Sequence, residues 1–251
     1  MDIKNPSILA AIAGITNGEF SGYCMEKGCA GFVTIGGYSI GKEMINASIK
    51  SRKRGRNEFV LKLGEEAKEI FNETCKISKF SNVFINLRLN SVDDAKKFSR
   101  NLKDYLGISD PILEINAHCR QIEIIQEGGG QNLLQRIITL NEIIKVFQSK
   151  DFKVSLKIRG NTVSPTSLKP HIKRWQLDFL HIDSYKEGFK GTDLQQLNCY
   201  AKALDVAIIG NNSVIDLQSA RAILETGANY FSIARAAEKD PLIFKNIIEY
   251  L

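Results

Sequence analysis

The sequence lacks the patterns that mark membrane spans, secretion signals and common metal sites. No stretch reaches the roughly 18 consecutive apolar residues that a membrane-spanning helix needs, and the N-terminal stretch has no basic start followed by a long apolar run. The five cysteines are an odd number without regular spacing, and neither C-x-x-C nor H-x-x-x-H occurs. We therefore expect a cytoplasmic protein that contacts no membrane and has neither a disulfide framework nor a metal site.

Linkers and low-complexity segments are also absent, and the bulk composition is ordinary. The chain has 251 residues, of which 43% are hydrophobic and 25% are charged, which is enough to bury a large core. A net charge of +6 favours anionic partners such as nucleic acid, cofactors or acidic substrates, but establishes none of them. We expect one domain that spans residues 1–251. The oligomeric state is not predicted by any of these features.

Short apolar runs alternate with amphipathic stretches along the whole chain. The runs are rich in Val, Ile, Leu and Phe and are bounded by turn residues, as expected for strands buried on both faces. Eight strands are predicted, at Ser7–Gly14, Gly31–Gly37, Asn82–Leu89, Pro111–Ala117, Lys153–Gly160, Asp178–Ser184, Val206–Asn212 and Asn229–Arg235. This number and rhythm are typical of an α/β protein of the (β/α)8 TIM-barrel class, whereas the alternative, a doubly wound open sheet, usually has fewer strands.

Two of the amphipathic stretches carry signals for helix ends. One opens at Ser91 with Asp94 three residues later and closes at Gly107, and the other opens at Ser213 and closes at Gly227. A serine side chain caps free N–H groups at a helix start, and glycine ends a helix in left-handed backbone. We therefore expect helices over both stretches.

A long basic connection, residues 38–59, interrupts the rhythm after the second strand. It contains the sequence SRKRGR, hereafter the basic segment, with cations at Arg52, Lys53, Arg54 and Arg56. Such a run is often only a solvated loop. Because loops after barrel strands line the working face, the basic segment is also a candidate contact for an anionic substrate.

The ends of the last two predicted strands combine small and polar residues with an arginine. Small residues let backbone N–H groups approach a phosphate, and arginine can pair with it. Barrels often bind phosphate at these two strand ends, although ordinary turns also use such residues. We expect a phosphate site formed by Gly210, Asn211, Asn212, Ala234 and Arg235.

Two other predicted strands carry polar residues spaced two apart. Lys157 and Arg159 share one strand face, as do His181 and Asp183. If the cations face the barrel interior they require an anionic partner, and the electron-rich edge of a flavin ring is one. The alternative is that they point outward beneath a helix. The His–Asp pair would orient a ring or substrate, or would lie at a solvated surface.

The stretch EINAHCRQ places Cys119 between His118 and Arg120, just past a predicted strand. The cysteine has three interpretations: a catalytic thiol, a metal ligand, or a small buried residue. The metal interpretation is the weakest because ligand partners at suitable spacing are missing. A cation nearby would favour the thiolate, whereas a proton donor must keep its hydrogen.

Four segments resemble, in order, motifs of the tRNA-dihydrouridine synthase family of flavin-dependent barrels. AAIAGITN resembles that family's APMAGVTD, and EINAHCRQIEIIQEGGGQNLL resembles its DINMGCP segment with the glycine run at the same spacing. VSLKIRG resembles VTVKIRLG, and the segment from AIIGNNS to the Asp-Pro pair resembles PVIGNGDI with its GADGVMIGRGA-type ending. These matches run from Ile8 to Pro241.

The resemblance implies bound FMN and a reaction on uridine in tRNA. Hydride would pass from reduced FMN to C6 of uracil, Cys119 would donate a proton to C5, Asn116 would hold the base, and Lys157 would lie at the flavin. NAD(P)H would be a transient electron donor, because no G-x-G-x-x-G fingerprint follows a strand. The implied cofactor-binding residues are Ala11, Ile12, Ala13, Asn86, Lys157, Asp183, Gly210, Asn211, Asn212, Ala234 and Arg235.

Around the substrate the sequence departs from the family pattern. His118 and Arg120 replace a glycine and a proline, and Asp183 and Tyr185 replace a histidine and an arginine. The sequence ends at Leu251, so we expect no separate RNA-binding domain. Two alternatives therefore stay open: a flavin oxidoreductase similar to dihydroorotate dehydrogenase that acts on a small molecule, and a non-catalytic barrel that binds a phosphorylated ligand.

Overall fold

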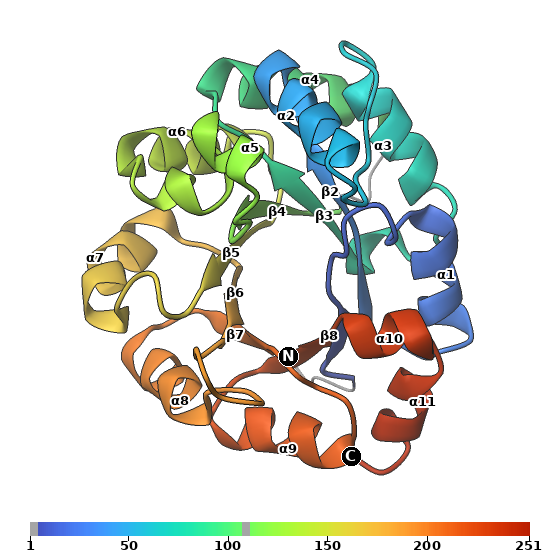
Figure 1. The fold of residues 1–251 in the computed structure, drawn as a ribbon, viewed down its shortest axis with the longest axis vertical. Coiled ribbons are helices and arrows are strands. Elements are labelled where there is room, and N and C mark those ends of the chain that lie inside the picture. Colours follow the sequence, from blue (N-terminus) through green and yellow to red (C-terminus); the bar gives the residue numbers. More distant parts are fainter. Residues whose placement is uncertain (1–4, 107–110) are drawn as a thin grey trace.

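In the computed structural model, which describes residues 5–106 and 111–251, eight parallel strands close into a barrel. β1 pairs with both β2 and β8, which closes the ring that Figure 1 shows end-on. The TIM barrel predicted from the sequence is confirmed, and the open sheet is wrong. The strands are β1 Ser7–Leu9, β2 Phe32–Ser39, β3 Val83–Arg88, β4 Ile112–Ala117, β5 Val154–Arg159, β6 Phe179–Asp183, β7 Ala207–Asn211 and β8 Tyr230–Ile233.

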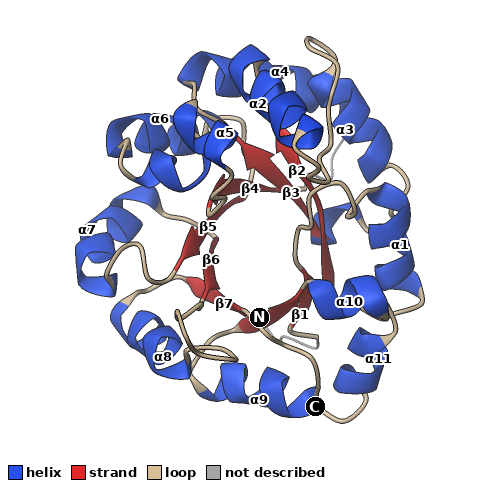
Figure 2. Ribbon diagram, in the orientation of Figure 1, coloured by secondary structure: helices blue, strands red, loops and turns tan. Residues whose placement is uncertain are grey.

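Helices surround the ring of strands on the outside, as Figure 2 shows. The α-helices are α1 Gly18–Glu26, α2 Lys42–Lys53, α3 Glu66–Thr74, α4 Val92–Tyr105, α5 Ile122–Gln126, α6 Ile137–Gln148, α7 Pro165–Trp175, α8 Leu194–Ala203, α9 Leu217–Glu225, α10 Arg235–Lys239 and α11 Ile243–Ile248. Short 3-10 turns lie at Phe80–Asn82 and Gly130–Leu134. None of the described helices is long and apolar enough to cross a membrane.

The two helix starts expected from the sequence differ in outcome. Ser91 caps α4 as predicted, because its side chain accepts a hydrogen bond from the N–H of Asp94 at 3.3 Å; the expected end at Gly107 lies outside the described residues. The start at Ser213 is wrong, since Ser213 adopts left-handed backbone (φ 53°) in the preceding loop. α9 instead begins after Asp216, which forms a capping box with Ser219.

The barrel interior is apolar at the N-terminal ends of the strands and polar at their C-terminal ends. Four rings, from Phe32, Phe84, Phe179 and Tyr230, meet edge-to-face with centroids 5.2–5.8 Å apart and close the N-terminal end. Because side chains alternate along a strand, the residues two and four positions after Phe84 face the same interior but lie nearer the C-terminal end. The chemistry of the barrel is therefore confined to the C-terminal strand ends and the loops after them, hereafter the barrel mouth.

Candidate active site

Glu114 on β4 is the centre of a buried hydrogen-bond network inside the barrel. Its Oε1 accepts from Nδ2 of Asn86 at 2.7 Å, and its Oε2 accepts from Oγ of Ser155 at 3.2 Å and from Nδ1 of His181 at 2.7 Å. Nε2 of His181 contacts Oγ of Ser232 at 2.8 Å. Glu114 was not among the residues predicted for the site, although its spacing of two from Asn116 indicates the same interior face.

Charges in this network balance around Lys157. The Lys157 side chain is buried, and among the described residues its ammonium has no hydrogen bond and no ion pair within 4.0 Å. Burial lowers the pKa of Lys157, and the charges of Glu114 and Asp183 oppose that shift. Burial alone would raise the pKa of Glu114, but His181 and Lys157 hold it at about 2.

His181 completes the network as a neutral ring. Burial lowers the pKa of His181 to about 4, and the positive charge of Lys157 adds to that effect. The carboxylate of Glu114 can only accept, so Nδ1 of His181 carries the hydrogen and Nε2 accepts from the hydroxyl of Ser232. At neutral pH Glu114 is therefore a carboxylate and the ring of His181 is uncharged.

Asn116 fixes the turn that carries Cys119. Its Oδ1 accepts the backbone N–H groups of His118 at 3.1 Å and of Cys119 at 3.0 Å, and its Nδ2 donates to Oδ1 of Asn86 at 2.8 Å. On the other side of this turn, the glycine run after Cys119 lets the backbone of Gly130 lie close to the backbone of Cys119. Gly130 has a φ of 54°, and a Cβ there would lie 2.5 Å from the carbonyl oxygen of Cys119.

The thiol of Cys119 faces a second chain of hydrogen bonds that the sequence did not indicate. Sγ donates to Oε1 of Gln121, and Nε2 of Gln121 donates to Oε1 of Glu58 at 2.5 Å. Oε2 of Glu58 accepts from Nη1 of Arg88 at 2.5 Å in a buried ion pair. Burial alone would lower the pKa of Arg88, but Cys119 and Glu58 raise it above its ordinary value, so the guanidinium is charged.

His118, just after β4, and Asp183, the last residue of β6, meet at the barrel mouth. Nε2 of His118 donates to Oδ2 of Asp183 at 2.6 Å, and Nη2 of Arg159 lies 3.3 Å from the same oxygen. Arg159 also lies over the ring of Tyr185 at 4.7 Å. Burial would raise the pKa of Asp183, but His118, Arg159 and Lys157 lower it. The side chain of His118 is therefore occupied with Asp183.

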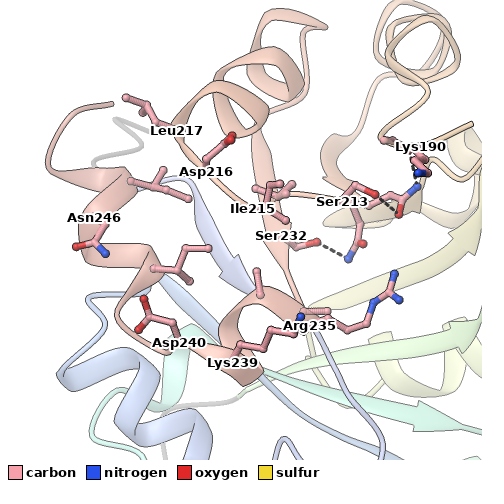
Figure 3. A pocket seen from close by; sticks show the side chains of 18 residues that line it. Lys190, Ser213, Ile215, Asp216, Leu217, Ser232, Arg235, Lys239, Asp240 and Asn246 are labelled. Atoms are coloured by element: carbon pink, nitrogen blue, oxygen red, sulfur yellow. Dashed lines mark hydrogen bonds between the residues drawn. The ribbon is translucent and has the colours of Figure 1, made fainter.

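A cavity of about 950 Å³ opens beside the ends of β7 and β8 (Figure 3). The side chain of Arg235 extends toward the part of the cavity where Lys190 and Ser213 lie. Four of the five predicted phosphate-site residues line this cavity, namely Asn211, Asn212, Ala234 and Arg235.

Gly210, the fifth predicted phosphate-site residue, does not line the cavity. A Cβ on Gly210 would lie 2.5 Å from Ile223 and 2.7 Å from Leu197, so the glycine permits close packing of α8 and α9. The three residues after β1 that were predicted to contact the flavin are half-buried in the following loop, where the N–H of Ile12 donates to Oγ1 of Thr16 at 3.0 Å; they are Ala11, Ile12 and Ala13.

The basic segment lies at the barrel mouth, beside α5. Arg54 forms a two-point ion pair with Glu123 at 2.8 and 2.9 Å, and Glu58 follows four residues later inside the mouth. The other three cations of the segment are exposed. Within the two described ranges, no three His, Cys, Asp or Glu side chains gather to hold a metal ion.

Comparisons with known proteins identify the family. No model of a known family matches the chain. An uncharacterized protein of Methanocaldococcus jannaschii is 33% identical over 236 residues, 92% of this chain and 89% of that protein. The tRNA-dihydrouridine synthases B of Pseudomonas putida and Vibrio parahaemolyticus are each 24% identical and span 99% of this chain, which covers 69% and 73% of them. This chain is a divergent member of the tRNA-dihydrouridine synthase family.

Two solved structures show the same barrel fold as this member of the family. DHODH of Eimeria tenella in complex with ferulenol superposes with a TM-score of 0.70 at 15% identity, over 97% of this chain and 79% of that one. A chain of the tryptophan synthase complex of Pyrococcus furiosus reaches 0.65 at 14% identity, over 97% of this chain and 98% of that one. At such low identity these similarities show the barrel alone.

Two substitutions that distinguish this chain from the family pattern come together in space. Asp183 stands where the resemblance places a histidine, and His118 stands where it places a glycine. The contact of 2.6 Å between them puts an imidazole beside the end of β6, although it is carried by the end of β4. Two residues at which the sequence departs from the family motifs are thus in direct contact at the barrel mouth.

Proposed function

We propose that the protein is an FMN-dependent oxidoreductase that reduces uridine in tRNA to dihydrouridine. The observation that carries the proposal is the ammonium of the buried Lys157 side chain, which has no hydrogen-bond partner among the described residues and lies on β5, next to β4, whose end leads into the turn of Cys119. A lone buried cation requires a partner with electron-rich acceptors. Membership of the tRNA-dihydrouridine synthase family supports a flavin in that role.

Other unpaired polar atoms at the barrel mouth also fit a flavin. Nε of Arg88, and Nε and Nη1 of Arg159, are buried and have no hydrogen-bond partner within residues 5–106 and 111–251. Together with Lys157 they offer donors to the oxygen and nitrogen acceptors of an isoalloxazine ring. Arg235, in the cavity between β7 and β8, would hold the phosphate, with Asn211 and Asn212 beside it.

The residues of the chain then have distinct tasks. Bound FMN supplies the hydride. Cys119 holds on Sγ the proton that C5 of uracil receives, and Asn116 keeps the backbone of Cys119 in place. Lys157 would stabilise negative charge on a bound flavin, and Glu114 with Asp183 favours its charged form. NAD(P)H is the proposed electron donor, visiting the mouth transiently.

Exposed cations of the basic segment support tRNA as the substrate. They lie at the mouth, where a uridine must leave its stack to reach the flavin. The mouth is also the place where loops of barrel enzymes contact their substrates. This substrate would place the protein in the cytoplasm.

Purified protein provides the test. The expected result is a yellow protein whose reduced flavin is reoxidised by tRNA that lacks dihydrouridine, with dihydrouridine appearing in the product by mass spectrometry. Cys119→Ala should abolish product formation while flavin stays bound, and Cys199→Ala, at an exposed cysteine, should have no effect. Protein that binds no flavin, even when FMN is added, would refute the proposal and favour a non-catalytic phosphate-binding barrel.

A second candidate, the same chemistry on a small anionic molecule, is favoured by the contacts of Arg159. This residue keeps two unpaired buried N–H groups next to Asp183 and His118, where the family pattern is not kept. Guanidinium groups of this kind bind carboxylates in a two-point manner. If a small pyrimidine carboxylate reoxidises the flavin and tRNA does not, the second candidate replaces the first.

A further inference from the structure

We propose that Gln121 is a positioning residue that keeps Cys119 as a directed, protonated thiol, and that the buried Glu58–Arg88 pair holds Gln121 in the required orientation. The inference deepens the proposed function, because it rests on Cys119 as the proton donor. It concerns three residues that have no role in the sequence-based predictions: Gln121, Glu58 and Arg88. Its physical basis is the direction in which each hydrogen bond of the chain must run.

The carboxylate of Glu58 determines which way the hydrogen bonds of the chain run. Ionised Glu58 can only accept, and it takes one hydrogen bond from Arg88 and another from Nε2 of Gln121, both at 2.5 Å. The amide of Gln121 is thereby oriented with its oxygen on the opposite side. That oxygen faces Sγ of Cys119 and offers no hydrogen. The contact is a hydrogen bond only while the sulfur carries its proton.

The chain is assembled from separate segments, and its ion pair is buried while Gln121 is half-buried. Glu58 comes from the loop after α2, Arg88 from the end of β3, and Gln121 from the turn before α5. The side chain of Glu58 is fully buried and that of Arg88 is 3% exposed. In a site of low dielectric, such a chain resists reorientation more than it would in water.

Among the described residues, the thiol of Cys119 has no hydrogen-bond acceptor other than Gln121. Cys119 packs on its apolar side against Met44, Ala47 and Ile124. The guanidinium of Arg88 is the nearby charge that would favour a thiolate, and the carboxylate of Glu58 pairs with it and balances it, while His118 is turned to Asp183. Gln121 is thus the only recorded side-chain hydrogen-bond partner of the thiol among residues 5–106 and 111–251.

This arrangement answers a conflict in the sequence around Cys119. A cysteine beside cations tends toward the thiolate, which has no proton to give. In the proposed step the S–H bond breaks, its electron pair stays on sulfur, and the proton joins C5 of uracil as the hydride from the flavin joins C6. The thiolate that results faces the guanidinium of Arg88 and regains a proton from water.

Alkylation of Cys119 by iodoacetamide tests the inference without any need for activity, because only the thiolate reacts. Gln121→Met preserves the length of the side chain but accepts and donates nothing. Glu58→Gln preserves shape but lets the amide of Gln121 turn round and leaves Arg88 without a counter-charge. The control is Gln195→Met, on the exposed face of α8.

The full-length protein is labelled at neutral pH, and the rate at each cysteine is read by peptide mass spectrometry. The exposed cysteines Cys29, Cys75 and Cys199 are internal references. Loss of one hydrogen bond to the thiol predicts labelling of Cys119 about three- to tenfold faster relative to the references in both variants. Gln195→Met is expected to match the parent.

Two outcomes would overturn the inference. One is an unchanged relative rate at Cys119 in Gln121→Met. The other is faster labelling of Cys119 together with buried Cys24, because that result reports opening of the fold. Failure of the proposed function is distinguishable: the labelling rates would change as expected while Cys119→Ala leaves dihydrouridine formation intact.

Discussion

The charge balance between Glu114 and Lys157 leads to a quantitative prediction about stability. Both residues are buried inside the barrel; Glu114 is the first charge that opposes the burial of Lys157, with Asp183 after it, and Lys157 lowers the pKa of Glu114 after the larger effect of His181. Glu114→Gln preserves shape but leaves the ammonium of Lys157 with less compensation. Lys157→Met removes the ammonium and leaves Glu114 with three hydrogen-bond donors, from Asn86, Ser155 and His181.

These contacts set the expected magnitudes. Glu114 and Lys157 compensate each other without a direct ion pair, so Glu114→Gln should cost less than the roughly 3–5 kcal/mol of breaking a contacting buried pair and should lower the free energy of unfolding by about 2–3 kcal/mol. Lys157→Met should cost less, about 1–2 kcal/mol, because hydrogen bonds to Glu114 still stabilise the carboxylate. The double variant removes both charges, and its loss in free energy of unfolding should be smaller than the sum of the two single losses by about 1–2 kcal/mol.

Urea denaturation followed by circular dichroism measures this cycle, with the slope compared among variants to confirm two-state unfolding. A matched cycle combines Lys157→Met with Glu238→Gln, an exposed carboxylate on α10, and should be additive within about 0.5 kcal/mol. If the losses from Glu114→Gln and Lys157→Met also add without a coupling energy, the charge balance drawn here is wrong.

Three other results are expected. Gly130→Ala should cost about 2 kcal/mol more than Gly55→Ala in thermal or urea unfolding, because both have positive φ but only Gly130 meets backbone, and equal losses would argue against the close approach. Folding lowers the pKa of His181 from 6.5 to about 4, so the unfolded chain binds a proton at this residue more readily than the folded protein does. The free energy of unfolding is therefore highest above pH 6.5 and decreases as the pH falls to 4. Urea titrations should therefore show a loss of ~3 kcal/mol between pH 7 and 4 that His181→Asn largely removes, and an unchanged profile would contradict the neutral ring. Serine at three exposed cations of the basic segment should weaken tRNA binding and flatten its salt dependence, whereas serine at three exposed lysines at the opposite barrel end should not; the sets are Arg52, Lys53 and Arg56, and Lys79, Lys150 and Lys153.

The barrel was predictable because each of its strands is buried on both faces. Such a strand requires a continuous apolar run, and the eight runs supply their own turn residues at both ends. Alternation within a strand also predicted that Lys157 shares a face with Arg159 and His181 with Asp183, but left open whether these faces point into the barrel; the contacts of His181 with Glu114 and Ser232 show that its face does. The same reasoning, applied to Asn116 on β4, would have added Glu114 to the predicted site residues.

The contacts of the thiol were not predictable by these means. Glu58 and Arg88 are 30 positions apart, and Gln121 is 63 positions from Glu58, so no periodicity relates them. They meet because a loop after α2 turns into the barrel mouth, and loop conformation depends on tertiary contacts. The false helix start at Ser213 has a similar origin: an ordinary capping pattern is overridden by left-handed backbone in the loop.

The most direct measurement of the central claim is the dihydrouridine content of tRNA from cells that lack their own dihydrouridine synthases and express this chain. Mass spectrometry of nucleosides should detect dihydrouridine with the parent protein and none with the Cys119→Ala variant expressed at the same level. Absence of dihydrouridine in cells that contain the folded, flavin-loaded parent protein would contradict the account and direct attention to a small-molecule substrate.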